Sequence, residues 1–237
     1  MIPWLAPGQP FPPVDEAFLE PNGLLAAGAD LHPATLLEAY RLGIFPWYRP
    51  SEPILWWSPD PRLVIEPSNV HVSRRMARTL RQPWQLTLDR SFDQVVEACA
   101  APRPGQAGTW ITREMKQAYR RMHQLGHAHS LEVWRDGELV GGIYGIAIGR
   151  AFFGESMFRR RRDGSKVALI SLCQFLAHHD FGLLDCQVES AHLLTLGAFN
   201  LPRSEFCERI AALTARDGPA GDWQAMARPI QWAPFFS

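Results

Sequence analysis

The sequence predicts an α+β protein, with a small N-terminal domain over residues 1–65 and a larger catalytic domain over residues 66–237. Strand-like alternation is concentrated in one antiparallel stretch, and helix-like periodicity lies on both sides of it. The proline-rich start, followed by one short helix pattern, indicates the separate N-terminal domain. The chain has 237 residues, of which 46% are hydrophobic, and this is enough to build both units around a proper core.

The N-terminal domain is expected to hold one helix between irregular segments. Residues 1–22 are proline-rich and should be mostly irregular. Asp30 fits an N-cap, Pro33 fits the first helical turn, and Gly43 fits the end of the helix. The aromatic motifs FPWY and WWSPDPR, which begin at Phe45 and Trp56, are expected on proline-containing loops. They either cover a small core or form an apolar wall for a ligand.

An antiparallel meander is predicted in the middle of the chain. Asp136-Gly137 is a strong hairpin signal between the alternating segments Leu131–Arg135 and Glu138–Val140. Ile143–Ile148 and Ala151–Phe158 follow as two further strands. Glycines within this stretch are expected at bulges.

The remaining elements complete the α+β order. They are expected as strands at 62–67, 84–88 and 183–188, helices at 73–80, 92–100, 112–125, 166–178, 190–196 and 204–215, and a turn at 197–203. A meander, a long helix and a following strand also match the acyltransferase fold typified by N-acetyltransferases. The larger domain is therefore expected to be acetyltransferase-like.

Composition excludes several classes of protein. The four cysteines are scattered without a CxxC pair, so neither a disulfide framework nor a zinc site is expected. The start lacks the pattern of a signal peptide, and no apolar run approaches the roughly 20 residues that span a bilayer. The chain is expected to be soluble and cytoplasmic, without a membrane partner.

The formal net charge is zero, but the arginines are unevenly distributed. One group is Arg74, Arg75, Arg78 and Arg81, and the other is the run Arg159, Arg160, Arg161 and Arg162. Such groups are usually a solvated face, and contact with phosphate is the alternative.

Glu155 stands out because a carboxylate interrupts an apolar strand. An unpaired buried carboxylate costs several kcal/mol, so Glu155 must have partners. By strand alternation, Phe153, Glu155 and Met157 share one face, and Asp185 and Gln187 share a face opposite Cys186. These polar groups are expected at the mouth of an apolar pocket lined by Trp110, Tyr119, Phe153 and Met157.

Eight motifs, in order between about Glu20 and Arg203, resemble the bacterial leucyl/phenylalanyl-tRNA–protein transferases. They are EPNGLLAAGADLHPATLLEAYRLGIFPWY, WWSPDPR, GTWIT, HAHSLEVW, LVGGIYGIAIGRAFFGESMF, SKVAL, LLDCQV and HLLTLGA. The run of arginines at 159–162 departs from the serine-led loop that is usual in the family.

The resemblance implies a reaction in which Leu or Phe, and less well Met, moves from aminoacyl-tRNA to a protein. The acceptor would be the α-amine of a protein that begins with Arg or Lys, which marks that protein for degradation by the N-end rule pathway. The resemblance implies no CoA, metal or ATP. This is chemically reasonable because the ester is already activated and an α-amine, with a pKa of about 7.7–8, is partly neutral at pH 7.

The resemblance also implies roles for individual residues. Trp47, Trp110, Tyr119, Phe153 and Met157 would form the substrate pocket, although ordinary core packing is the alternative. The catalytic group would be Glu155, Asp185 and Gln187. The tRNA acceptor stem would contact Arg74, Arg75, Arg78, Arg81, Arg159 and Arg160, mostly through phosphates.

The catalytic roles stay open in detail. Glu155 would hold the ribose or an amino group, and a salt bridge inside the fold is the alternative. The carbonyl of Gln187 can accept a hydrogen bond from the attacking amine. Asp185 could polarise Gln187 or take the proton through it, and a purely positional role for both residues is nearly as well supported.

Other kinds of function fit less well. A CoA-dependent acetyltransferase should show a glycine-rich loop before the long helix, and RRRRDGSK contains one glycine. A non-catalytic RNA-binding module would not explain an acidic residue and an amide among apolar strands. The histidines at 123, 127, 129, 178 and 179 match no zinc motif.

Overall fold

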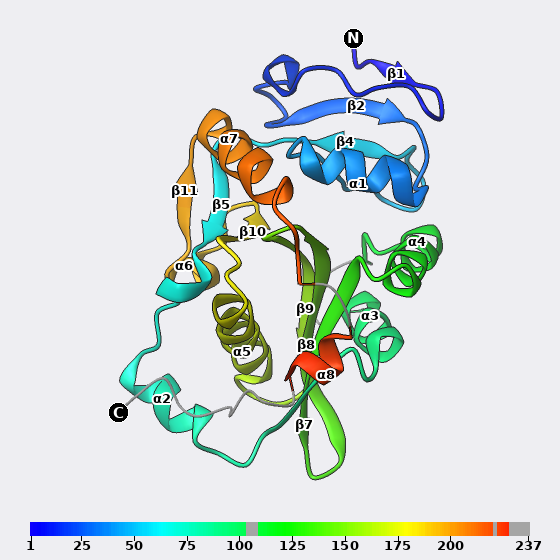
Figure 1. Cartoon of the computed structure of the whole chain (residues 1–237). Coiled ribbons are helices and arrows are strands. Elements are labelled where there is room, and N and C mark those ends of the chain that lie inside the picture. The colour runs from blue at the N-terminus through cyan, green and yellow to red at the C-terminus, as the bar shows by residue number, and fades with distance from the viewer. Residues whose placement is uncertain (103–108, 220–221, 228–237) are drawn as a thin grey trace.

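The computed structural model describes residues 1–102, 109–219 and 222–227, which form two β-sheets with helices around them (Figure 1). The smaller sheet comes from the N-terminal part of the chain, and the larger sheet carries helices on both faces. The α+β class with an N-terminal unit is therefore confirmed.

The N-terminal sheet contains more strand than the sequence predicts. Its strand order is β1 (Trp4–Leu5), β2 (Leu24–Gly28), β4 (Leu55–Trp57) and β3 (Phe45–Pro46). The residues Phe45-Pro46 and Trp56-Trp57, expected on loops, pair with each other as β3 and β4. Trp56 is fully buried and donates from Nε1 to the backbone oxygen of Gly28 at 2.9 Å. One tryptophan thus provides much of the core under this sheet.

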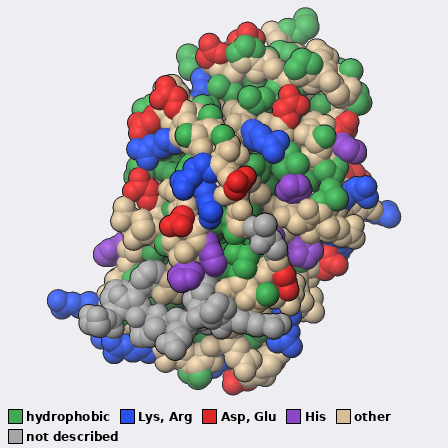
Figure 2. Space-filling view, viewed as in Figure 1, with side chains coloured by type: hydrophobic (Ala, Val, Ile, Leu, Met, Phe, Trp, Pro, Cys, Tyr) green, Lys and Arg blue, Asp and Glu red, His purple; other side chains and the backbone are tan. Residues whose placement is uncertain are grey.

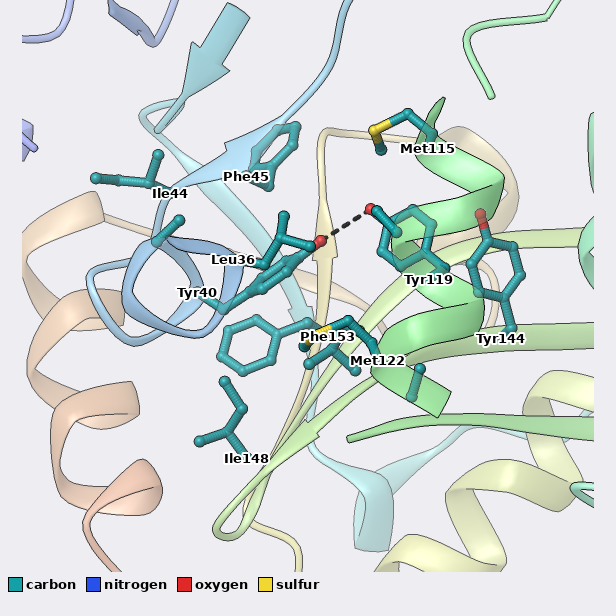
Figure 3. Packing of buried hydrophobic residues seen from close by; sticks show 14 of the residues in the cluster. Leu36, Tyr40, Ile44, Phe45, Met115, Tyr119, Met122, Tyr144, Ile148 and Phe153 are labelled. Carbon is teal, nitrogen blue, oxygen red and sulfur yellow. Dashed lines mark hydrogen bonds between the residues drawn. The ribbon is translucent and has the colours of Figure 1, made fainter. Parts of the chain in front are cut away.

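Helix α1 (Pro33–Arg41) lies where the sequence predicts it, but its N-cap is His32. Asp30 accepts hydrogen bonds from the His32 backbone N–H and the Thr35 hydroxyl, each at 2.8 Å, so it braces the entry to the helix. Gly43, with φ of 79°, follows the helix and turns the chain into β3. Tyr40 of α1 and Phe45 of β3, on either side of this turn, both face the larger sheet (Figure 3).

The larger sheet is built around the predicted meander. Its strand order is β11 (Phe199–Leu201), β5 (Arg62–Ile65), β10 (Leu183–Gln187), β9 (Ala151–Arg159), β8 (Glu138–Ile148), β7 (Ala128–Arg135) and β6 (Gln85–Leu88). Strands β6 to β9 are antiparallel neighbours. Asp136 and Gly137 both have positive φ between β7 and β8, as a tight hairpin turn requires.

A long helix connects the meander to the next strand. α5 (Gly164–His178) leads from β9 to β10, which pairs parallel to β9. The predicted order of meander, long helix and following strand is confirmed, although the helix begins at Gly164 with Asp163 as N-cap. A Cβ on Gly141 of β8 would lie 2.6 Å from the backbone carbon of Gly164, so this glycine lets the helix start directly against the sheet.

Helices cover the two faces of the larger sheet differently. α5 packs on one face, and α3 (Phe92–Ala100) and α4 (Arg113–Gln124) pack on the other (Figure 1). The remaining helices are the short η1 (Val14–Glu16) and η2 (Pro67–Asn69), α2 (Arg74–Leu80), α6 (Ala191–Leu194), α7 (Arg203–Thr214) and α8 (Trp223–Ala227). In the described part of the chain, no helix is long and apolar enough to cross a membrane.

Two details differ from the sequence-based expectations. The segment 197–203, expected as a turn, contains β11, which pairs with β5 at the edge of the sheet. Arg62–Ile65, expected at the end of the N-terminal domain, pairs within the larger sheet as β5. The domain boundary at residue 65 itself stays a prediction.

The C-terminal helix α8 is fixed to the larger sheet by Trp223. This side chain is 2% exposed, stacks on His129 at 3.8 Å between ring centroids, and packs against Phe175 of α5 at 4.7 Å.

We expect Trp223→Ala to lower the free energy of unfolding by about 3–5 kcal/mol, measured by urea unfolding. Trp4→Ala is the matched control, because Trp4 is 68% exposed, and should change it by less than about 0.5 kcal/mol. A loss from Trp223→Ala as small as that expected for Trp4→Ala would show that Trp223 does not hold α8 to the sheet.

Candidate functional site

Glu155 is the extra residue of a β-bulge. Opposite β9, Tyr144 pairs with Ser156 and Gly145 pairs with Gly154, so Glu155 has no partner across the ladder. A Cβ on Gly145 would lie 2.1 Å from a backbone oxygen of β9, so the bulge needs a glycine at this position. The irregularity turns the carboxylate of Glu155 into the structure.

The bulge also changes which side chains share a face. Phe153 packs against Tyr40, with ring centroids 5.2 Å apart, in the core beneath α1 and α4. Met157 instead packs with the core beneath α5. The predicted common face for Phe153, Glu155 and Met157 is therefore wrong, because strand alternation is broken between them.

Three neutral donors reach the Glu155 carboxylate. Tyr40 donates to Oε1 at 2.7 Å, Tyr119 donates to Oε2, and the Gln187 amide Nε2 donates to Oε1 at 3.2 Å. The two tyrosine hydroxyls also lie 3.0 Å from each other (Figure 3). Helix α1 of the N-terminal unit and helix α4 thus meet at one carboxylate of the larger sheet.

Burial raises the pKa of Glu155 to about 7, although the hydrogen bonds from Tyr119 and Tyr40 act in the opposite direction. Burial, with the charge of Glu155, also raises the pKa of both tyrosines well above the usual value, so they remain protonated donors. A carboxyl group that titrates near neutral pH can both accept and return a proton.

Asp185 on the neighbouring strand has a different environment. Its two oxygens accept from Arg62, with Nε to Oδ1 at 2.8 Å and Nη2 to Oδ2 at 2.7 Å. Oδ1 also accepts the backbone N–H of Gln187 at 2.9 Å. Asp185 and Arg62 are 1% and 0% exposed, so this is a buried ion pair with its hydrogen-bonding capacity largely used.

Gln187 ends β10 in a left-handed conformation with φ of 66°, next to a second bulge. Its Nε2 points at Glu155, and its carbonyl Oε1 is therefore oriented away from that carboxylate. Cys186 packs against the core beneath α5, whereas Asp185 and Gln187 reach Arg62 and Glu155 on the side of the other core, so their predicted opposite faces are confirmed.

An apolar pocket of about 260 Å³ opens beside Glu155 and Gln187. It lies between the N-terminal unit, which contributes Phe45 to Trp47, and the larger sheet with α5 and α6. Its lining is Phe45, Pro46, Trp47, Trp110, Ile143, Gly154, Glu155, Ser156, Met157, Leu169, Leu184, Asp185, Cys186, Gln187, Val188, Ser190 and Leu193.

Three of the five residues expected in the substrate pocket line it, namely Trp47, Trp110 and Met157. Tyr119 and Phe153 do not, because both are fully buried beneath the floor of the pocket. Tyr119 still reaches the site through its hydrogen bond to Glu155, whereas Phe153 supports Tyr40.

The two arginine groups meet near the start of α5. Arg74, Arg75, Arg78 and Arg81 lie exposed on α2 and at its end, and Arg75 pairs with Asp163 at 3.2 Å. Arg159 and Arg160 are exposed after β9, where Arg160 donates to the Leu139 backbone oxygen at 3.1 Å. Figure 2 shows Lys and Arg side chains at the lower left of the molecule, in the region of α2 in Figure 1.

Two residues of the site were missed at the sequence level, Tyr40 and Arg62. Tyr40 was assigned only to the apolar face of a helix, and nothing local distinguishes it from a core tyrosine. Arg62 begins the otherwise apolar strand RLVIEP. A charged residue in an apolar strand is the signal that identified Glu155, and it would have identified Arg62 as well.

The site does not present an activated covalent nucleophile. Burial raises the pKa of the Cys186 thiol well above its usual value, so it stays protonated. In the described ranges, no group of three or more His, Cys, Asp and Glu residues is placed to hold a metal ion. Of the histidines, His129 instead contacts Asp89 at 2.7 Å and stacks on Trp223.

An apolar pocket beside a carboxyl group with a near-neutral pKa and an amide can hold an acyl group and exchange a proton with an amine, which is chemistry suited to an acyltransferase. The family model for leucyl/phenylalanyl-tRNA protein transferase matches residues 64–211, and the model for its N-terminal domain matches residues 29–60. The chain belongs to the leucyl/phenylalanyl-tRNA–protein transferase family, and it is an aminoacyltransferase.

Curated relatives match over nearly the whole chain. A leucyl/phenylalanyl-tRNA–protein transferase of Azoarcus sp. is 55% identical over 98% of this chain and 100% of its own length. That of Aromatoleum aromaticum is 56% identical over 94% of each chain. Among solved structures, a GCN5-related N-acetyltransferase from Kribbella flavida aligns with a TM-score of 0.38 and 14% identity, over 83% of this chain and 75% of its own. A likeness that low carries no argument about the site.

The raised pKa of Glu155 makes the stability of the protein depend on pH. In the unfolded chain Glu155 ionises near 4.5, whereas the folded protein keeps its proton until about pH 7. Between these values the unfolded state binds fewer protons, so stability falls as pH rises. Relative to Glu155→Gln, the unsubstituted protein should lose about 3 kcal/mol of unfolding free energy between pH 4 and pH 8.

Urea unfolding at a series of pH values measures this difference. Glu138→Gln is the control for loss of a carboxylate, because the Glu138 side chain is 73% exposed. The two proteins, Glu155→Gln and unsubstituted, could instead differ in unfolding free energy by the same amount at every pH. That result would contradict a buried Glu155 that keeps its proton to near pH 7.

Proposed function

We propose that the enzyme transfers Leu or Phe, and less well Met, from aminoacyl-tRNA to the α-amine of proteins that begin with Arg or Lys. In this proposal it acts in the cytoplasm and marks those proteins for degradation by the N-end rule pathway. The observation that carries the proposal is the 3.2 Å contact between Glu155 and Gln187 at the mouth of an apolar pocket. Membership of the family supports the donor and the general class of acceptor.

The pocket suits an unbranched apolar side chain. Ile143, Met157, Leu169 and Leu184 bring apolar groups to it from β8, β9, α5 and β10. Leu, Phe and Met present such a side chain without a branch at Cβ. Shape alone discriminates between similar apolar side chains by about 1–3 kcal/mol, which fits a preference shared among three amino acids.

Two tryptophans offer a surface for the terminal adenine of the tRNA. Trp47 is 43% exposed and its ring packs edge-on against Trp57 at 5.7 Å, which holds it at the rim of the pocket. Trp110 lines the pocket from the segment that precedes α4. Stacking of a base on an aromatic side chain contributes about 1–3 kcal/mol, and it would place the ester next to Glu155.

In the proposed mechanism the acceptor α-amine attacks the carbonyl carbon of the ester. The Gln187 carbonyl Oε1 accepts a hydrogen bond from this amine and orients its lone pair. Glu155 takes the proton that the nitrogen loses as the C–N bond forms, and returns a proton to the ribose oxygen as the C–O bond breaks. The products are an extended protein and a tRNA with a free terminal hydroxyl group.

Asp185 fits a positional role better than that of a proton acceptor. Its oxygens already accept two hydrogen bonds from Arg62 and one from the Gln187 backbone. Adding a proton to Asp185 would leave the buried charge of Arg62 uncompensated.

The exposed arginines suit contacts with the tRNA backbone. Arg75 pairs with Asp163, the N-cap of α5; Arg74, Arg78 and Arg81 are exposed on α2 or at its end, and Arg159 and Arg160 are exposed where β9 ends. Arginine contacts to phosphate are indifferent to base sequence, which suits an enzyme that accepts the tRNAs of more than one amino acid.

A transfer assay tests the proposed acceptor. We expect label from leucyl-tRNA to appear on peptides that begin with Arg or Lys, without added CoA, and not on the same peptides after N-terminal acetylation. Acetylation removes the nucleophilic amine and leaves the rest of the peptide unchanged, so it is the matched control. Transfer to peptides regardless of their first residue, or only in the presence of acetyl-CoA, would contradict the proposal.

Gln187→Ala tests the role of the amide. Removing a group that orients the reacting atoms should lower kcat about 100-fold, while the affinity for aminoacyl-tRNA changes less than about threefold. Gln85→Ala, at an exposed amide on β6, serves as the control. Equal losses in kcat and in tRNA affinity would assign Gln187 to substrate binding instead.

A further inference from the structure

Arg62 is fully buried where the N-terminal unit meets the larger sheet. Its guanidinium carbon lies 4.7 Å from the ring centroid of Phe45 and 4.5 Å from that of Phe206, so it is enclosed by two aromatic rings. Its Nη1 donates to the Gly43 backbone oxygen at 2.9 Å, while Nε and Nη2 donate to Asp185. One side chain thereby joins the end of α1, β3, α7 and β10.

The contacts of Arg62 affect both the amide of Gln187 and the wall of the pocket. Oδ1 of Asp185 accepts both Arg62 Nε and the backbone N–H of Gln187, so the position of the guanidinium fixes the left-handed residue that carries the amide. Phe45, against which Arg62 packs, lines the pocket. A movement of Arg62 would therefore shift the Gln187 amide and the pocket wall together.

We propose that Arg62 is a positioning residue for aminoacyl transfer: through Asp185 it holds Gln187 in the conformation that meets Glu155, and through Gly43 and Phe45 it sets the N-terminal wall of the pocket. This inference goes beyond the proposed function and uses one part of it, the role of Gln187 in orienting the amine.

The shape of the side chain matters as much as its charge. Oxygens of Asp185 and Gly43 accept hydrogen bonds from three different nitrogens of the Arg62 guanidinium group. This planar group lies between two aromatic rings. An ammonium group cannot present that fixed fork, so lysine would keep the charge of Arg62 without its geometry. The positive charge also offsets that of Asp185 near Glu155, whose other neighbours are Tyr40, Tyr119 and Gln187.

A double-mutant cycle separates positioning from mere support of the fold. The variants are Arg62→Lys, Gln187→Ala and the combination, with Arg62→Met as a variant without charge. We expect Arg62→Lys to lower kcat about 10-fold and Arg62→Met about 100-fold, with the KM for leucyl-tRNA changed less than about threefold. If Arg62 acts in part through Gln187, Arg62→Lys should lower kcat clearly less in the Gln187→Ala background than in the unsubstituted enzyme.

The positive charge of Arg62 can be tested separately through the pH dependence of kcat. Loss of the positive charge in Arg62→Met should move the acidic limb of the pH–kcat profile to higher pH, because Glu155 then keeps its proton up to a higher pH. Arg62→Lys should leave this limb in place. Arg150→Met is the control, since Arg150 donates to the His179 backbone oxygen at 2.5 Å and contributes nothing to the pocket lining. It should leave both kcat and the profile unchanged.

Several outcomes would overturn the inference. Losses from Arg62→Lys and Gln187→Ala that multiply in the combined variant would show that Arg62 does not act through Gln187. Arg62→Lys with an unchanged kcat would show that the fork is not needed, and this test stands even if Arg62→Met does not fold. By contrast, failure of the unsubstituted enzyme to use peptides beginning with Arg or Lys would count against the proposed acceptor, and the cycle would then be measured with the acceptor that it does use.

Discussion

The site depends on two buried carboxylates on adjacent strands, which have different hydrogen-bond partners. These partners decide which carboxylate can exchange a proton. Asp185 on β10 receives a full opposite charge from Arg62, together with a backbone donor. Glu155 on β9 receives neutral donors, and burial raises its pKa to about 7. The same residue chemistry therefore provides one ion-paired group and one group that exchanges a proton near neutral pH. The division of roles follows from the partners of each carboxylate.

These partners come from both parts of the chain. The N-terminal unit supplies Tyr40 to Glu155 and, through Gly43, an acceptor for Arg62. The larger sheet supplies the two carboxylates and the amide of Gln187. The hydrogen bonds around Glu155 and Arg62 are thus complete only when the N-terminal unit packs against the larger sheet. Packing between the two units and the chemistry of the site depend on the same contacts.

Much of this arrangement can be predicted from sequence, where the signal is local. The Asp136-Gly137 hairpin, the antiparallel meander and the long helix α5 follow from turn residues and periodicity. Glu155 and Gln187 were identified as polar residues in apolar strands, and they do lie together. The glycines of the meander did indicate a bulge, and one lies at Gly145 opposite Gly154, but its effect on the faces of β9 could not be predicted, because alternation is itself the signal from which faces are assigned. A single extra residue therefore moved Phe153 and Met157 to different cores. Tyr40 was missed because its importance depends on a partner 115 residues away in the chain, whereas Arg62, a charged residue in an apolar strand, carried a local signal that was overlooked.

The absence of an activated nucleophile at the pocket is consistent with what the chemistry requires. An aminoacyl ester already carries the energy needed to form a peptide bond, and an α-amine is nucleophilic once it has lost a proton. The enzyme gains most by holding the two reactants at bonding distance and by removing one proton at the right moment, and well-oriented reactants alone can account for about 7–11 kcal/mol of the barrier. A displacement of the orienting groups by about 1 Å can cost about 100-fold in rate. A rigid, buried guanidinium that fixes the backbone of Gln187 is therefore a more useful neighbour for this reaction than a second reactive side chain would be.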